Sequence, residues 1–182
     1  MPSPADLPDT LPAPPHWRVW PQRLPHRLEV PETSLWFNLE VSAWRHPAKP
    51  AYRFGGRALS FRELHAQALA LAGWLQAVGV KRGDRVLLFA QNCPQFVVAV
   101  YAILRADAVV VPVNPMNRAE EFGHYITDPE TKVVICAADL AGIVAEANGR
   151  LPEAQRLRAT LVTRYADMLP EVIPPELAPQ EA

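Results

Sequence analysis

The sequence lacks a loop of the kind that binds phosphate groups. Its eight glycines are scattered along the chain, and serine occurs only at Ser3, Ser34, Ser42 and Ser60. Neither G-x-x-x-x-G-K-[ST] nor G-x-G-x-x-G is present, so no stretch can surround a phosphate with backbone N–H groups and hydroxyls. We therefore predict that these residues bind no nucleotide cofactor by themselves.

The sequence also lacks long apolar runs and an excess of charge of one sign. No run approaches the ~20 residues that a bilayer-spanning helix needs, and the formal net charge is −1. Residues 1–15 are too polar and too rich in proline for a signal peptide. These features predict a cytoplasmic protein with no transmembrane segment and no nucleic-acid partner.

Cysteine is scarce, since the chain has only Cys93 and Cys136. Their spacing is not that of a C-x-x-C metal or redox pair, and each lies in or beside a run predicted to be a buried strand. We expect both to be reduced packing residues and predict no metal site.

The dominant positive feature is an alternation of short β-branched runs with longer helical segments between Asp84 and Ala137. The runs at 85–90, 109–113 and 132–137 are nearly all apolar, which is typical of parallel strands covered on both faces. Pro94 lies at the first position of a predicted helix. The segment 95–105 that follows it is apolar on almost every side, so this helix is expected to be buried. The pattern predicts a βαβαβ unit.

Elements of the same kind follow this unit. Asn117 with Glu120 is predicted to cap a short helix at 118–127, which Asp128-Pro129 ends. Residues 139–149 are predicted to form a short amphipathic helix, and residues 159–163 a fourth parallel strand.

A helix and a hairpin are predicted before the βαβαβ unit. Thr33 or Ser34 can cap a helix at 34–45 whose apolar side chains are Leu35, Phe37, Leu39, Val41 and Trp44. Strands at 51–54 and 57–61 flank Gly55-Gly56, a pair suited to a two-residue turn. Ser60 and Glu63 form a capping box for a packing helix that ends at Gly79.

Proline marks both ends of the chain. It recurs so often between residues 1 and 31 that these are predicted to form an arm, with the α/β subdomain at 32–164 and an acidic, proline-rich linker at 165–182. Trp17, Trp20 and Leu28 could dock the arm on its own domain or on a partner subunit of a homodimer. We also expect some apolar surface around Phe89, residues 97–101 and Val111 to stay uncovered.

Four pieces of the sequence recur in this order and spacing in one enzyme family. They are GDRV at a strand start, NCPQF at a helix start, AILR at a helix end and VPVNP at a strand end. With the block at 34–79, they make residues 28–163 resemble the AMP-forming adenylating enzymes, most closely the bacterial acyl-CoA synthetases. Many relatives carry glycine where this chain has Asp107, so the turn there must tolerate a side chain.

The resemblance implies a fold and a parent reaction. The fold is a doubly wound, mostly parallel sheet flanked by helices, with an N-terminal helix and β-hairpin. The parent enzyme would use ATP, Mg²⁺ and coenzyme A to convert a carboxylic or fatty acid to acyl-CoA, AMP and pyrophosphate. The family's phosphate loop, of the type S-G-T-T-G-x-P-K-G, and its lid with the catalytic lysine are absent from these residues. The resemblance therefore assigns no catalytic, cofactor-binding or metal residue here.

Three residues that match the family motif are candidates for the substrate side. Asn92, Asn114 and Pro115 lie at predicted carboxyl ends of parallel strands, where open α/β sheets place ligands. The alternative is that they only form turns and caps.

Three interpretations follow. The first is an N-terminal fragment of an acyl-CoA synthetase, inactive alone, whose partner is the remainder of the synthetase in cis or as a separate chain. The second is a standalone, non-catalytic α/β interaction module or one half of a split adenylating enzyme. The third, a nucleotide-binding domain of another kind, is disfavoured by the missing glycine loop.

Overall fold

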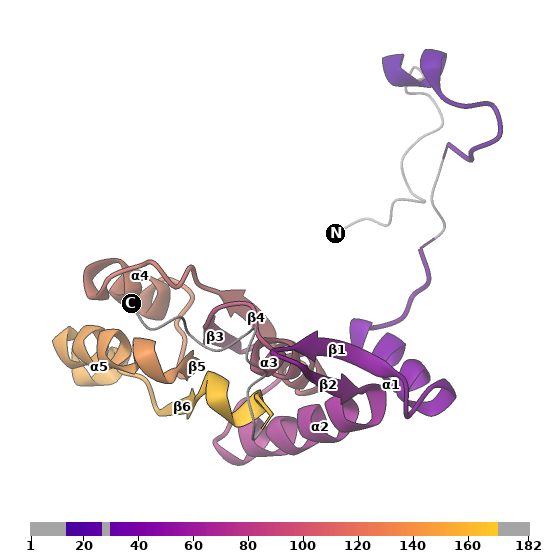
Figure 1. The fold of residues 1–182 in the computed structure, drawn as a ribbon. Coiled ribbons are helices and arrows are strands. Elements are labelled where there is room, and N and C mark those ends of the chain that lie inside the picture. The colour runs from indigo at the N-terminus through magenta and orange to yellow at the C-terminus, as the bar shows by residue number, and fades with distance from the viewer. Residues whose placement is uncertain (1–13, 27–29, 171–182) are drawn as a thin grey trace, which may run out of the picture. The chain divides into compact units, whose positions relative to one another are not determined.

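A computed structural model describes residues 14–26 and 30–170 of the 182-residue chain (Figure 1). The chain divides into two units, Met1–Thr33 and Ser34–Ala182, and each is described by itself. The first unit contains a 3-10 helix, η2 (Pro15–Val19). The second unit contains the helices and strands of the α/β fold. No helix in the described ranges is both long and apolar enough to cross a membrane.

Four strands of the second unit form a parallel sheet in the order β4-β3-β5-β6. They are β3 (Arg85–Phe89), β4 (Val109–Pro112), β5 (Val133–Ala137) and β6 (Ala159–Thr163). The central strands β3 and β5 are buried along almost their whole length. The predicted parallel sheet is therefore confirmed, including its fourth strand.

Strand β4 differs from the prediction that its run is covered on both faces. It lies at an edge of the sheet, where it pairs with β3 on one side, and the Val109 side chain is 47% exposed. An apolar run cannot by itself distinguish a central strand from an edge strand, because that depends on which strands pair.

Helices cover both faces of the sheet, which makes it doubly wound, as predicted (Figure 1). Successive side chains of β3 and β5 point to opposite faces. One face packs against α4 (Ala119–Thr127) and α5 (Ala141–Arg150) through Leu87, Phe89, Val134 and Cys136. The other packs against α2 (Phe61–Ala77) and α3 (Pro94–Arg105) through Val86, Leu88, Val133 and Ile135.

The predicted N-terminal helix and hairpin are present as α1 (Leu35–Arg45), β1 (Pro50–Phe54) and β2 (Arg57–Ser60). β1 and β2 pair antiparallel, and Gly55 and Gly56 have φ values of 53° and 84° in the turn. The Ser60 hydroxyl accepts a hydrogen bond from the Glu63 N–H at 3.3 Å, and the Glu63 carboxylate accepts one from the Ser60 N–H at 2.8 Å. The predicted capping box is therefore confirmed.

Helix α1 is present where it was predicted, but only some of its apolar side chains are buried. Trp36 and Leu39 are its buried residues, whereas Leu35, Phe37 and Trp44 are exposed, Trp44 by 81%. Trp36 stacks on His65 of α2, with ring centroids 4.9 Å apart, and the Arg105 guanidinium lies 5.6 Å from the Trp36 ring centroid. These contacts with neighbouring helices orient α1, and they are not visible in its own sequence.

The start of α4 also differs from the prediction, by one residue. Arg118 is the N-cap residue, and the carboxylate of Glu121 accepts a hydrogen bond from its backbone N–H at 3.0 Å. The predicted pair was Asn117 and Glu120. Asn117 instead belongs to the preceding turn, where its N–H donates to the Asn114 carbonyl at 3.0 Å.

The turn at Asp107 holds a side chain, as expected. Asp107 has a φ of 56°, which is unusual for a residue other than glycine but tolerated by aspartate. Its carbonyl accepts a hydrogen bond from the Gly83 N–H at 2.8 Å. The turn is thereby tied to the chain segment that leads into β3.

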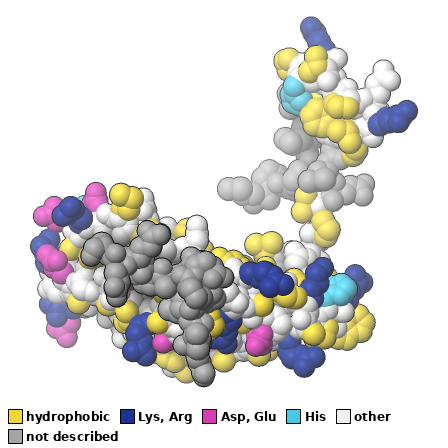
Figure 2. Space-filling view, viewed as in Figure 1, with side chains coloured by type: hydrophobic (Ala, Val, Ile, Leu, Met, Phe, Trp, Pro, Cys, Tyr) yellow, Lys and Arg dark blue, Asp and Glu magenta, His cyan; other side chains and the backbone are white. Residues whose placement is uncertain are grey.

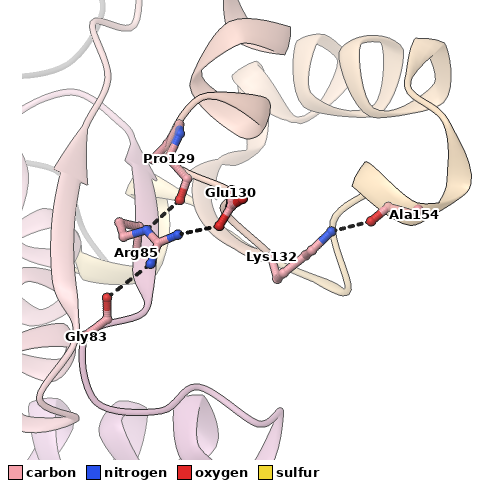
Figure 3. A network of polar contacts seen from close by, with 6 residues as sticks. All are labelled: Gly83, Arg85, Pro129, Glu130, Lys132 and Ala154. Atoms are coloured by element: carbon pink, nitrogen blue, oxygen red, sulfur yellow. Dashed lines mark hydrogen bonds and ion pairs between the residues drawn. The ribbon is translucent and has the colours of Figure 1, made fainter.

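The amino ends of β3 and β5 are held by side chains that donate to backbone carbonyls (Figure 3). Arg85 donates to the carbonyls of Pro129 and Gly83, and its guanidinium lies 3.4 Å from the Glu130 carboxylate. Lys132 donates to the Ala154 carbonyl at 2.6 Å. We call these residues the amino-end network.

The residues expected to leave apolar surface are covered to different degrees. Phe89 is fully buried and stacks on Phe122 of α4 with ring centroids 4.6 Å apart. Val97, Val100, Tyr101 and Val111 are half-buried. The exposed large apolar side chains of this unit are elsewhere. They lie on α1 and the two edge strands (Leu35, Phe37, Trp44, Val109 and Val162) and at Leu69, Met116 and Tyr125.

Candidate functional site

The three predicted site residues lie together at the carboxyl end of the sheet, just beyond strands β3 and β4. The two strands are parallel neighbours, with Leu88 paired to Pro112 at their ends. Asn92 follows β3, and Asn114 and Pro115 follow β4. Both asparagines are exposed and Pro115 is half-buried. Their role in binding a ligand stays a prediction.

Asn114 takes part in the turn that leads from β4 to α4. Its side-chain oxygen accepts a hydrogen bond from the Met116 N–H at 3.0 Å, and its carbonyl accepts one from the Asn117 N–H. An asparagine commonly makes this pair of bonds to close a turn. The side-chain N–H groups of Asn114 are left to meet solvent or a ligand.

A groove of about 640 Å³ lies beside this turn, between the β4–α4 connection and α5. Its walls are Pro115, Met116, Asn117, Arg118, Ala119 and Glu120 on one side and Ile143, Glu146 and Arg150 on the other. Arg150 pairs with Glu146 and lies 3.9 Å from Glu120. The groove therefore carries equal numbers of arginines and glutamates and offers no excess charge to an anion.

A second polar cluster, which the sequence interpretation missed, joins the ends of β3 and β6. The Gln91 N–H donates to the Tyr165 hydroxyl at 3.0 Å, and the Gln95 side-chain N–H donates to the Arg164 carbonyl at 2.7 Å. Tyr165 begins the 3-10 helix η5 (Tyr165–Met168), which follows β6. The signal in the sequence is Gln95 itself, a polar residue in the first turn of a helix that is apolar from there to Leu104 except for the Tyr101 hydroxyl.

Gln95 is the most unusual member of this cluster. It is only 8% exposed, and its side-chain oxygen is buried with no hydrogen-bond partner among the described residues. A buried acceptor without a partner costs about 1–3 kcal/mol. Gln95 also lines a small pocket of about 150 Å³ together with Thr163 and Met168. The other residues that line this pocket are apolar: Leu71, Val98, Ile135 and Leu161.

The titrating groups near this edge have pKa values that favour their neutral forms. Burial raises the pKa of the Cys136 thiol to about 11, and the charge of Asp139 adds to the effect. Burial also raises the pKa of Cys93 and of Tyr165. Both cysteines are free and buried, so at neutral pH they are protonated and unreactive packing residues.

The residues of this edge do not fit Mg²⁺-ATP. Binding it requires several N–H groups and a free cation around the phosphates, and carboxylates around the metal. The groove does offer one exposed cation, Arg118, which has no ion pair among the described residues, but Arg150 is engaged with Glu146. The N–H groups of Met116 and Arg118 are used within the turn and cap, so no set of free N–H groups surrounds a phosphate position there. No group of three His, Cys, Asp or Glu side chains able to hold a metal occurs in residues 14–26 and 30–170.

Comparison of the sequence with known proteins finds a clear family. Residues 39–181 match the model of the AMP-binding enzymes. The long-chain-fatty-acid–CoA ligase of Bacillus subtilis is 38% identical over 116 residues, which are 64% of this chain and 21% of that protein. The enzyme of the same name from Salmonella typhimurium is 32% identical over 84% of this chain and 28% of its own length.

Further matches include a relative that is named for another substrate and two proteins whose structures have been solved. The feruloyl-CoA synthase of an Amycolatopsis species is 38% identical over 58% of this chain and 22% of its own length. The N-terminal domain of FACL13 from Mycobacterium tuberculosis superposes with a TM-score of 0.67 at 25% identity, over 72% of this chain and 34% of that one. A fatty acyl CoA synthetase from M. tuberculosis gives 0.66 at 26% identity, over 71% and 26%. The chain thus spans between 21% and 28% of the length of the curated relatives described above.

Proposed function

Because the chain belongs to the AMP-binding enzyme family, we propose that it serves as the N-terminal part of an acyl-CoA synthetase. The main support for this proposal is the family match over residues 39–181, together with homology to the N-terminal region of acyl-CoA synthetases. In the proposed reaction, a carboxylic or fatty acid attacks the α-phosphate of ATP and releases pyrophosphate. The thiol of coenzyme A then takes the acyl group from the adenylate and releases AMP.

In this proposal the present residues act as a scaffold. The relatives are about three times as long as this chain, since 116 aligned residues are 21% of one and 160 are 28% of another, and the groups at the strand ends do not fit Mg²⁺-ATP. ATP, Mg²⁺ and coenzyme A would therefore be bound chiefly by a remainder, supplied in the same protein or as a second chain. We place the activity in the cytoplasm and assign the substrate only as a carboxylic acid, since relatives are named for both long-chain fatty acids and ferulate.

Asn92, Asn114 and Pro115 have a place in this proposal. They would line the side of the sheet that faces the remainder, together with the buried oxygen of Gln95. A buried acceptor without a partner among residues 14–26 and 30–170 supports that orientation, because a donor from the remainder could satisfy it.

The first experiment tests the chain alone. Calorimetry with ATP and Mg²⁺, and acid-dependent exchange of pyrophosphate into ATP, are expected to show neither tight binding nor turnover. Clear exchange by the purified chain would contradict the scaffold role and would mean that the catalytic groups lie within these residues.

The second experiment tests the parent function. Residues 34–170 would replace the matching N-terminal segment of the B. subtilis ligase, and acyl-CoA formation would be measured with a series of acids. An active chimera is the expected result, since the two sequences are 38% identical over 116 residues. A folded but inactive chimera would instead favour the standalone interaction module.

A further inference from the structure

Residues 14–26, which we call the aromatic arm, form a small cluster held by their own side chains. The ring of Trp17 stacks on that of His26 with centroids 4.3 Å apart and an interplanar angle of 25°. Trp20 contacts the rings of His16 and His26 edge-on, and its indole N–H donates to the Leu24 carbonyl at 3.2 Å. The prolines of the arm limit its backbone freedom in addition.

The surface of the aromatic arm combines apolar and cationic groups and carries no anionic side chain. Val19 is 84% and Leu24 is 54% exposed beside the half-buried tryptophans. Arg18 and Arg23 are exposed, and no Asp or Glu occurs between residues 10 and 28. Figure 2 shows yellow apolar side chains gathered in this segment, with dark blue cationic ones projecting around them.

We propose that the aromatic arm binds the surface of an anionic lipid bilayer. Tryptophan rings favour the headgroup level, where the apolar part is buried and the indole N–H meets polar groups. Val19 and Leu24 would enter the upper acyl region, and Arg18 and Arg23 would lie against lipid phosphates. This inference does not depend on the proposed enzymatic function.

The size and charge of the arm favour a bilayer over a protein partner. A stable protein interface engages about 20–30 residues on each side, whereas residues 14–26 are far fewer. Interfacial binding instead grows with buried apolar area and with cationic charge, and a segment this short supports reversible attachment. All formal charges of residues 14–26 have one sign, opposite to that of phosphatidylglycerol.

The test uses the whole 182-residue chain with vesicles of phosphatidylcholine alone and of phosphatidylcholine with phosphatidylglycerol. Sedimentation should bring down the chain with the anionic vesicles, and added salt should weaken the binding. The double variant R18Q/R23Q should lower the partition coefficient about fivefold for each arginine. The variant W17A/W20A should lower it about tenfold or more through lost apolar burial.

Matched controls come from the second unit. R62Q/R82Q removes two exposed arginines, and W44A removes a tryptophan that is 81% exposed. Both should bind anionic vesicles as the unchanged chain does, and circular dichroism should show an intact fold in every variant. Equal binding to neutral vesicles, equal losses in the controls, or self-association that replaces vesicle binding would each overturn the proposal.

Discussion

The two ends of the parallel sheet are built differently. At the amino ends of the strands, the side chains of Arg85 and Lys132 donate to backbone carbonyls, and cavities of about 250 and 470 Å³ lie among the same residues. At the carboxyl ends, asparagines are exposed, a groove is open, and the Gln95 oxygen is buried without a described partner. The difference lies in the polar groups: Arg85 and Lys132 are paired with backbone carbonyls at the amino end, whereas the Gln95 oxygen at the carboxyl end has no partner among the described residues and is suited to a further contact.

The largest effect is expected from the packing beneath the carboxyl end. Phe89→Ala would remove a fully buried ring that stacks on Phe122 and should lower the free energy of unfolding by about 3–5 kcal/mol. Phe37→Ala, at an exposed position of α1, should change it by less than about 0.5 kcal/mol. Denaturant unfolding measures both, and a small loss for Phe89→Ala would mean that this end is loosely packed.

The next effect is a loss of stability at alkaline pH. The pKa of Cys136 is raised from 9.0 to about 11, so its contribution is complete below pH 9 and is lost as the pH rises through 11. The loss from this thiol should amount to about 2–3 kcal/mol. Cys93 and Tyr165, whose pKa values are also raised, contribute with the same sign.

Cys136→Val isolates this contribution. Unfolding free energies measured at about pH 8 and about pH 11 should differ less for the variant than for the unchanged chain. If both proteins lose the same amount, the carboxyl end does not hold the thiol in its neutral form.

A smaller effect is expected at the amino-end network. Arg85→Met keeps most of the side-chain volume but removes the bonds to Pro129 and Gly83, which should cost about 1–2 kcal/mol. Glu130→Gln should cost almost nothing, because its ion pair with Arg85 is exposed to solvent. Equal losses for the two variants would show that the ion pair, and not the bonds to carbonyls, stabilises this end.

An effect on stability smaller than that of Arg85→Met is expected at Gln95. Gln95→Met removes the bond to the Arg164 carbonyl but also removes a buried acceptor that has no described partner, so the free energy of unfolding should change by less than about 1 kcal/mol. In the B. subtilis chimera, the same substitution should reduce acyl-CoA formation if the remainder supplies the missing donor. A chimera that retains full activity would remove Gln95 from the candidate site.

Local patterns predicted most of the elements. The capping box of Ser60 and Glu63, the glycine pair of the hairpin and Pro94 at the start of α3 all appear where the sequence placed them. Each of these features depends mainly on residues within a few positions along the chain, so the local sequence is enough to predict it. The cap of α4 was predicted one residue too early, since Glu121 and not Glu120 accepts the hydrogen bond, and the burial of Trp36 in α1 depends on its stacking on His65 of α2.

The candidate site was predictable only in part. The positions of Asn92 and Asn114 after parallel strands follow from the order of strands and helices, whereas the pairing of Gln91 with Tyr165 joins residues 74 positions apart. No pattern along the chain reports such a contact. The unpartnered oxygen of Gln95 is likewise visible only once its surroundings are known.

The sequence by itself determined the α/β class, the order of the elements and the family, because these depend on hydrophobic period, caps, turn residues and motif spacing. Tertiary structure alone decided that β4 is an edge strand, that α1 buries Trp36 instead of Trp44, and which polar groups meet at the two ends of the sheet. The physical reason is that burial and hydrogen bonding between distant segments depend on how the strands pair and which helices cover them.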